Sequence, residues 1–443
     1  MPTAYILIVF VLAIVLMIVL ISKCHVNASI GILIAAIFLA IGLHTPWETI
    51  EDTINSGFSG TIKSVAIVIF LGCTMGTVLE KTGAAVTITK WAIGLVGDKN
   101  IIWAIALASF ILGIPIFADT VVILLIPIVS LLAVRTGKSM MSYGTALYLG
   151  ALVTASLVPP TPGPVAAAAL LHVHLGQAIL WGLLVAIPSV IVATFYCIIF
   201  LNKEKVEPKQ EFLKAASESE EMILPGLQKS LLPIIVPLVL ILCNTAISVA
   251  LPDTGFANFM AFIGSPLAAL FTGCIISLTL TGKKWKTPEV LNKWVDEGVH
   301  AAAMPIIVTG MGGALAAFVK NAGVADQIAE VVMKSSFPPI LIPIIIAALI
   351  HVITGSNALG VMTAAALVEP MLGTLGVSPI AAFLACGTGA LMFKHANSSG
   401  FWVTVSMSNM NVDQGIKGVG GASTVAGFTG AVITCILYAL HVI

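Results

Sequence analysis

The chain of 443 residues is 59% hydrophobic and only 9% charged, with a mean hydropathy of +1.10 and no formal net charge. Because an ordinary soluble protein carries about 25% charged residues, this composition excludes a water-soluble protein and indicates a helical protein with many spans in a lipid bilayer. The balanced charge implies no polyanionic partner such as a nucleic acid, and the ten-residue alternation of an outer-membrane barrel is absent.

Ten apolar stretches are long enough to cross a bilayer, which takes about 20 residues in a helix. The first stretch, "AYILIVFVLAIVLMIVLI", has neither the basic start nor the small-residue cleavage site of a signal peptide, so we expect it to be retained as a span. The expected crossings are residues 4–22, 27–44, 58–79, 140–172, 177–201, 230–251, 259–281, 300–319, 379–410 and 421–443. The predicted fold class is an all-α polytopic membrane protein.

Two further apolar regions, residues 101–134 and 339–373, are interrupted near their middles. The first interruption reads "GIPIFADT" (residues 113–120) and the second reads "ITGSNALG" (residues 353–360). Each region is predicted to form a re-entrant hairpin, which enters and leaves the membrane on one side. Residues 84–97 and 287–298 are expected to form surface helices.

Two of the expected crossings also contain helix-breaking sequences. Crossing 140–172 contains "SLVPPTPGP" (residues 156–164), and crossing 379–410 contains "KHANSSGFW" (residues 394–402). Proline removes a backbone N–H and frees a carbonyl of the preceding turn, and hydrocarbon offers that carbonyl no partner. Such backbone is tolerated at membrane depth where it is buried in protein or lines a polar cavity.

The distribution of lysine and arginine predicts the orientation. If residues 202–229 form a cytoplasmic linker, sixteen of the 20 basic residues lie inside, three lie outside, and Lys394 lies within a span. This asymmetry favours ten crossings and two hairpins, with both termini on the periplasmic side.

The chain also repeats itself. "GCTMGTVLEKTGAA", which begins at Gly72, resembles "GGALAAFVKNAGVA", which begins at Gly312, 240 residues later. We therefore expect a first repeat over residues 1–201 and a second over residues 230–443, each with five crossings and one hairpin. Since five is odd, the second repeat is inverted, an arrangement typical of secondary transporters.

The four interruptions are predicted to converge near the midplane of the membrane. Helix N-termini with free N–H groups favour anions, and serine, threonine and asparagine supply neutral hydrogen bonds. We expect a site for a small anionic solute, without a metal or cofactor. The candidate substrate-binding residues are Thr120, Ser156, Thr161, Gly163, Gly355, Ser356, Asn357, Lys394, His395, Asn397, Ser398 and Ser399.

Four stretches resemble, in order, the signature stretches of the gluconate permease (GntP) family within the wider ion transporter superfamily: "LGIPIFADTVVILLIPI", "VPPTPGPVAAA", "TGSNALGVMTAAALV" and "HANSSGFW". The resemblance implies a permease of the bacterial inner membrane for sugar acids and related carboxylates, coupled to protons. The superfamily implies a homodimer with a scaffold and an elevator-like transport domain. Thr161 replaces the usual histidine, Ser398 replaces the usual aspartate, and Lys394 adds a cation.

Three titratable residues at the interruptions leave alternatives open. Asp119 is predicted either to couple transport to protons or to cap the second hairpin helix. Lys394 is predicted either to pair with a substrate carboxylate or to extend towards water. His395 is expected to act in proton coupling or as a neutral hydrogen-bonding group. Gly355 and its two successors suit a ligand-facing tip or a plain turn.

The sequence thus predicts a secondary active transporter, a proton symporter for gluconate or a related hydroxy acid. A carrier for another solute such as serine, with sodium coupling, is the alternative within this class. A channel and an intramembrane enzyme are alternatives from other classes, although no H-E-x-x-H motif occurs. Glu369 is expected to pair with a neighbour near the outer surface.

Overall fold

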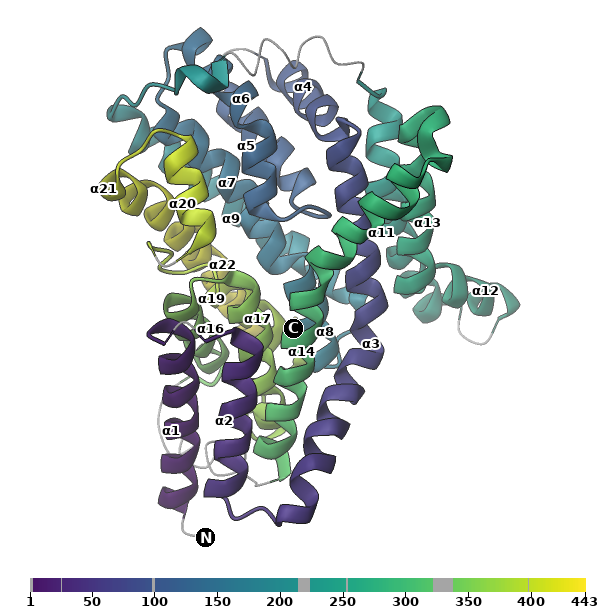
Figure 1. Cartoon of the computed structure of the whole chain (residues 1–443), viewed down its shortest axis with the longest axis vertical. Coiled ribbons are helices and arrows are strands. Elements are labelled where there is room, and N and C mark those ends of the chain that lie inside the picture. The colour runs from purple at the N-terminus through teal and green to yellow at the C-terminus, as the bar shows by residue number, and fades with distance from the viewer. Residues whose placement is uncertain are drawn as a thin grey trace.

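The computed structural model describes residues 3–24, 26–97, 100–213, 224–251, 254–321, 338–396 and 398–443. This part of the chain is built from helices and contains no strand (Figure 1), which confirms the all-α prediction. Within it, eight helical stretches are long and apolar enough to cross a membrane, and a ninth is α3, which bends by 47° between Lys63 and Val65. The chain is a multi-pass membrane protein.

The helices before the linker include both long spans and short pieces. In chain order they are α1 (Thr3–Ser22), α2 (Ala28–Gly42), α3 (Trp47–Lys81), α4 (Ala84–Val96), α5 (Ile101–Leu112), α6 (Ala118–Thr136), α7 (Met140–Leu157), α8 (Pro162–Leu170) and α9 (Leu175–Ile199).

The helices after the linker follow a similar succession. They are α11 (Leu227–Ala250), α12 (Gly255–Ile263), α13 (Pro266–Leu278), α14 (Val295–Asn321), α16 (Leu341–Thr354), α17 (Asn357–Val368), α18 (Leu372–Leu375), α19 (Pro379–Gly389), α20 (Ser399–Met407), α21 (Val412–Gly415) and α22 (Gly421–Ala439).

Helices break at each of the four sequence interruptions. The breaks separate α5 from α6, α7 from α8, α16 from α17, and α19 from α20. Local sequence explains the breaks: Pro162 occupies the first position of α8, and Gly355 ends α16 in the left-handed region at φ 70°. The Pro159–Pro160 peptide bond is cis.

Two expected elements differ from the structure. The crossing predicted over 259–281 is divided into α12 and α13, because Ser265 caps α13 by accepting a hydrogen bond from the Ala268 N–H and Pro266 follows at its first position. The surface helix predicted over 287–298 is not separate, since helical backbone runs from Glu289 to Asn321 without a break.

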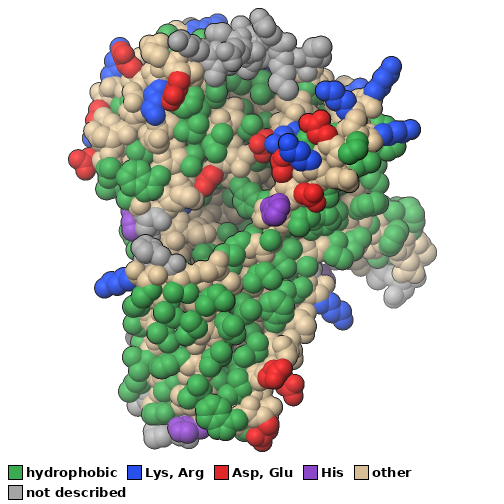
Figure 2. Space-filling model, viewed as in Figure 1, with side chains coloured by type: hydrophobic (Ala, Val, Ile, Leu, Met, Phe, Trp, Pro, Cys, Tyr) green, Lys and Arg blue, Asp and Glu red, His purple; other side chains and the backbone are tan. Residues whose placement is uncertain are grey.

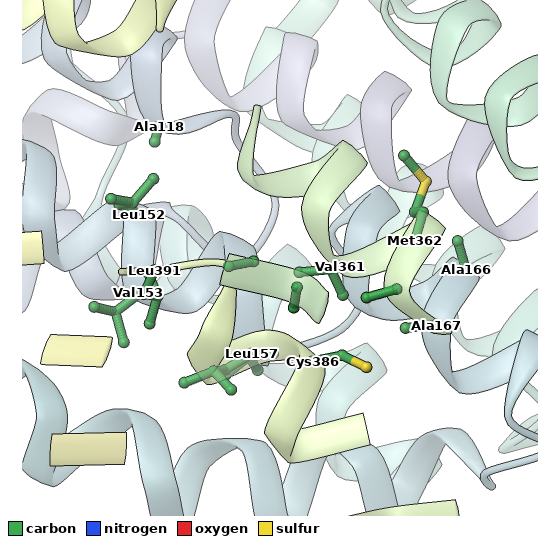
Figure 3. Close-up of a cluster of buried hydrophobic side chains, with 14 of the residues drawn as sticks. Ala118, Leu152, Val153, Leu157, Ala166, Ala167, Val361, Met362, Cys386 and Leu391 are labelled. Atoms are coloured by element: carbon green, nitrogen blue, oxygen red, sulfur yellow. The ribbon is translucent and has the colours of Figure 1, made fainter. Parts of the chain in front are cut away.

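The helices α7 and α8 form the centre of the molecule. The most apolar window of Met140–Leu170 is 94% buried, whereas that of Leu227–Ser248 is 28% buried. Figure 3 shows side chains of α7, α8, α17 and α19 meeting in this core, with Leu157 of α7 beside Cys386 of α19. Close approach is enforced at Gly387, where a Cβ would collide with the Leu157 side chain.

The paired helices α3 and α14 pack through small residues. A Cβ on Gly57 would lie 2.6 Å from the Gly313 carbonyl oxygen, so neither position accommodates a larger side chain without a shift of backbone. Figure 2 shows hydrophobic side chains over much of the lower part of this face and a hollow above them.

Hydrogen bonds hold the start of the linker to the beginning of α7 and to α21. The Ser139 hydroxyl donates to the Glu204 carbonyl oxygen at 2.6 Å, and the Met140 N–H donates to the Val206 carbonyl oxygen at 2.9 Å. The hydrogen bond that the Gln414 amide donates to the Glu204 carboxylate, at 2.6 Å, lowers the pKa of that carboxyl, as does the Lys417 ammonium. Residues 214–223 of the linker lie outside the described part.

Candidate functional site

A cavity of about 510 Å³ lies where the four breaks meet, a volume typical of small-molecule sites. The charged and most of the polar lining residues come from the breaks. The apolar lining residues include Ala28 of α2 and Met304, Pro305 and Val308 of α14. The residues that the breaks contribute are Phe117, Ala118, Asp119, Thr120, Thr161, Pro162, Gly163, Gly355, Ser356, Asn357, Ala358, Leu359, Lys394, Ser398, Ser399 and Gly400.

Four helices begin at this cavity: α6, α8, α17 and α20. Their N-cap residues are Phe117, Thr161, Ser356 and Ser398, and all four line the cavity. The first N–H groups of a helix have no acceptor within the helix, and the helix dipole places partial positive charge there. Four such ends around one cavity favour an anionic ligand.

The N-terminus of α8 carries few N–H donors because Pro162 and Pro164 have none. Gly163, between them, keeps its backbone N–H and lines the cavity, and a Cβ at this position would lie 3.3 Å from the Ala358 Cα. The Thr161 hydroxyl donates to the Val158 carbonyl oxygen at 2.9 Å, which satisfies an end of α7. The proline-rich break therefore presents one backbone N–H and one hydroxyl oxygen to the cavity.

Lys394 lies in the wall of the cavity and is only 3% exposed. Its ammonium donates to the Asn357 Oδ1 at 2.5 Å and lies 5.7 Å from the centre of the Tyr148 ring. The side chain thus bridges the break after α19 and the start of α17. A lysine that extends to bulk water would be exposed at its tip, so this geometry does not fit the alternative of a lysine reaching for the surface.

Asp119 lies in the first turn of α6 and lines the same cavity. Its Oδ2 accepts a hydrogen bond from the Ser399 hydroxyl at 2.9 Å, and it interacts electrostatically with Lys394. The N-cap of α6 is Phe117, not Asp119. The cavity therefore contains one carboxylate and one ammonium from the protein, so its lining is close to neutral before a ligand enters.

Tyr148 was not anticipated from the sequence. Its side chain, from the middle of α7, lines the cavity, is 2% exposed, and hydrogen-bonds with the Ser398 side chain. Gly400 passes so close that a Cβ there would collide with the Tyr148 hydroxyl. A buried tyrosine hydroxyl needs a polar partner, and that requirement is the only signal in the sequence that could have pointed to it.

The structure brings most of the candidate residues together and leaves two away from the cavity wall. The candidates on the wall are Asp119, Thr120, Thr161, Gly163, Gly355, Ser356, Asn357, Lys394, Ser398 and Ser399. Ser156 is buried, and its hydroxyl donates to the Leu152 carbonyl oxygen at 2.9 Å. His395 points elsewhere, with its Nε2 2.8 Å from the Val352 carbonyl oxygen. Asn397 lies outside the described residues.

A second cavity, of about 490 Å³, lies at the opposite ends of α8 and α14. Its charged residue Glu369 pairs as expected with neighbours: its Oε1 lies 3.6 Å from His172 Nε2 and 4.0 Å from Lys320 Nζ. Across the described ranges, no group of three histidine, cysteine, aspartate or glutamate side chains is placed to hold a metal ion.

The fold is shared with a protein of known structure. It is similar to the crystal structure of the YdaH transporter of Alcanivorax borkumensis, with a TM-score of 0.64, 14% sequence identity, and coverage of 91% of this chain and 90% of that chain. The two chains therefore share a helical membrane fold.

Sequence relationships then identify the family. The GntP family permease model matches residues 5–441, so the chain belongs to the GntP family, and the resemblance of its motifs is confirmed. The chain is 35% identical to an uncharacterized permease of Haemophilus influenzae, over 90% of this chain and 85% of that protein. It is 31% identical to a gluconate permease of Pseudomonas aeruginosa, over 98% of each. The chain is a permease, and the alternative of an intramembrane enzyme is wrong.

Proposed function

We propose that this permease is a secondary active transporter that moves a small polyhydroxy carboxylate, such as gluconate, across the bacterial inner membrane. The observation that carries the proposal is the burial of Lys394 in a cavity around which four helix N-termini are arranged. A buried ammonium and the N–H groups at the helix starts together complement one carboxylate. The name of the Pseudomonas aeruginosa relative, a gluconate permease, supports the same substrate class.

The hydroxyl groups of the substrate would meet neutral partners on the same wall. Thr120, Ser356, Ser398 and Ser399 place side-chain hydroxyls at the cavity. A site that hydrogen-bonds substrate hydroxyls discriminates strongly against analogues that lack them, because its buried polar groups are then left unpaired. A chain of carbons with several hydroxyls therefore suits this wall better than a simple fatty acid.

The charge balance of the cavity supports coupling to protons. In the empty site Asp119 and Lys394 offset each other, and a bound carboxylate adds one uncompensated negative charge. A proton on Asp119 restores neutrality, so that Lys394 is free to pair with the substrate. One proton and one monovalent carboxylate would then cross together, which avoids burying a net charge.

A second candidate is a zwitterionic amino acid such as serine. The observation in its favour is that Asp119 and Lys394 line one cavity with opposite charges, so that one can face an ammonium and the other a carboxylate. Sodium coupling belongs with this alternative, since Asp119 would then stay ionised.

Competition binding to the purified protein separates the two candidates. In this experiment, glycerate and serine compete separately with radiolabelled gluconate. The two competitors are of similar size, but glycerate has a hydroxyl where serine has an ammonium group. Stronger displacement by glycerate supports the sugar-acid proposal, whereas stronger displacement by serine refutes it. If the protein has no measurable affinity for either gluconate or glycerate, the sugar-acid proposal is also refuted.

We further propose two inverted repeats that place the two hairpins opposite each other. The recurrence of helix starts supports this arrangement: α5 and α16 begin at Ile101 and Leu341, and α6 and α17 begin at Ala118 and Asn357. The repeat model places both termini outside, the linker in the cytoplasm, and two copies in an elevator-like dimer. In a background without the native cysteines, Lys205→Cys should react with an impermeant maleimide only after permeabilisation of the cells; labelling of intact cells would reverse the orientation.

A further inference from the structure

The break between α19 and α20 exposes a run of backbone carbonyl groups inside the protein. Residues 390–393 are not part of either helix, yet Ala390, Leu391 and Met392 are buried. A buried carbonyl without a hydrogen-bond donor destabilises the fold. The three carbonyls are satisfied by side chains of other helices: Asn357, Ser423 and His351, respectively.

His351 donates to the last of these carbonyls, that of Met392. It belongs to the last turn of α16, is 1% exposed, and has its Nδ1 2.8 Å from the Met392 carbonyl oxygen. A carbonyl only accepts, so the proton is on Nδ1, and within the described chain the buried Nε2 has no partner. This contact holds the backbone two residues before Lys394.

His395 makes the reciprocal contact, one residue after Lys394. Its Nε2 lies 2.8 Å from the Val352 carbonyl oxygen. Val352 lies in the last turn of α16. Backbone carbonyls in the last turn of a helix have no N–H donor within the helix and need a donor from elsewhere. The end of α16 therefore supplies His351 to the Met392 carbonyl, and the segment before α20 supplies His395 to the Val352 carbonyl. Lys394 lies between Met392 and His395 in the chain.

Asn357 completes the connection at the cavity. Its amide nitrogen donates to the Ala390 carbonyl oxygen at 2.6 Å, and its amide oxygen accepts from the Lys394 ammonium. The tip of the α16–α17 pair and the segment before α20 are thus joined on both sides of Lys394. The side chain of Lys394 has little freedom to leave the cavity while these contacts persist.

We propose, on the basis of the carboxylate transport proposed above, that His351 and His395 are positioning residues that hold the Lys394 ammonium in the substrate cavity. Each donates a ring N–H to a backbone carbonyl. Neither contacts the substrate, since neither belongs to the cavity wall in the described part of the chain. The affinity of the site for a carboxylate depends on them through Lys394.

The test exploits the different nitrogen that each histidine uses. An asparagine amide can replace the Nδ1 donor, and a glutamine amide can replace the Nε2 donor. His351→Asn and His395→Gln should therefore bind gluconate nearly as well as the parent chain. His351→Leu and His395→Leu, and the exchanged pair His351→Gln and His395→Asn, should bind it about tenfold more weakly.

A double-mutant cycle with Lys394→Met separates positioning from a general loss of structure. If the histidines act through Lys394, neither leucine variant weakens gluconate binding further once Lys394 is methionine. An equal loss in both backgrounds refutes positioning while leaving the proposed function intact. No gluconate binding by the parent chain refutes the proposed function instead.

Hydrogen exchange provides a readout that needs no substrate. Amide exchange over residues 390–396, measured by mass spectrometry on the full chain, should accelerate in both leucine variants and stay slow in His351→Asn and His395→Gln. The melting temperature of each variant is recorded in parallel. If a leucine variant does not fold, the test compares the asparagine and glutamine variants at the same position. Unchanged exchange in folded leucine variants overturns the proposal whatever the substrate.

Discussion

Replacing Lys394 by methionine probes the charge on which substrate binding depends. Lys394 is 3% exposed and its ammonium donates to the Asn357 Oδ1, so methionine, of similar length, removes the charge without opening a large void. Loss of one partner from a desolvated charge pair costs about 2–5 kcal/mol. Since about 1.4 kcal/mol is a factor of ten in affinity, we expect gluconate to bind Lys394→Met at least about tenfold more weakly.

Two features of the structure affect the size of this loss of affinity. The four helix N-termini remain in the variant and continue to attract the carboxylate, which keeps the loss from being complete. Asn357 loses its partner at the amide oxygen, which adds to the loss. Lys394→Arg keeps the charge but must place a larger planar group in the same wall, so it should retain part of the affinity.

The assay is equilibrium binding of radiolabelled gluconate to purified protein, with the melting temperature measured on the same samples. Lys417→Met is the matched control, because its side chain is 60% exposed at the linker and its ammonium lies 3.4 Å from Glu204 rather than at the cavity. This control should bind gluconate like the parent chain. If Lys394→Met also binds within about twofold of the parent, a cavity anchored on Lys394 is refuted.

Three further substitutions test other parts of the structure. Asp119→Asn should abolish accumulation driven by a pH gradient in proteoliposomes while sparing substrate exchange; accumulation that persists would assign the proton to another group. Gly400→Ala brings a Cβ against the Tyr148 hydroxyl, and the overpacking should lower the melting temperature and weaken gluconate binding, at a cost of about 1–3 kcal/mol; unchanged binding would place the substrate away from this wall. Because the Gln414 hydrogen bond lowers the pKa of Glu204, its stabilising effect is fully present above the ordinary glutamate pKa of about 4.3 and is lost as the pH falls further, through the lowered pKa of the folded state. Glu204→Gln should therefore lower the melting temperature at neutral pH, and a difference that stays constant into strong acid would contradict this reasoning.

The positions of the four breaks were predictable because helix-breaking residues act locally. Pro162 cannot continue a helix from its N-terminal side, and Gly355 adopts a left-handed conformation that other residues avoid. In an apolar chain such residues are conspicuous, so the sequence alone indicated where irregular backbone would lie. The division of the crossing predicted over 259–281 was missed, although Ser265 and Pro266 form an ordinary helix start.

The side chains that face the cavity were only partly predictable. Asp119, Lys394 and Ser399 stood out as polar residues in apolar surroundings, and all three line the cavity. Tyr148 was missed because it lies in the middle of α7, whose residues are buried on every side. Helical periodicity cannot tell which buried face of such a helix meets a cavity.

What the sequence determined by itself is the membrane class, the helical fold, the four breaks and the family, because composition and helix-breaking residues are local properties. What only the tertiary structure decided is the partner of each polar group. His395 was expected at the site but bonds the Val352 carbonyl oxygen, and His351, inside an apolar helix, bonds the Met392 carbonyl oxygen. A buried donor pairs with whichever carbonyl the packing brings within about 3 Å, and that packing joins helices far apart in the chain.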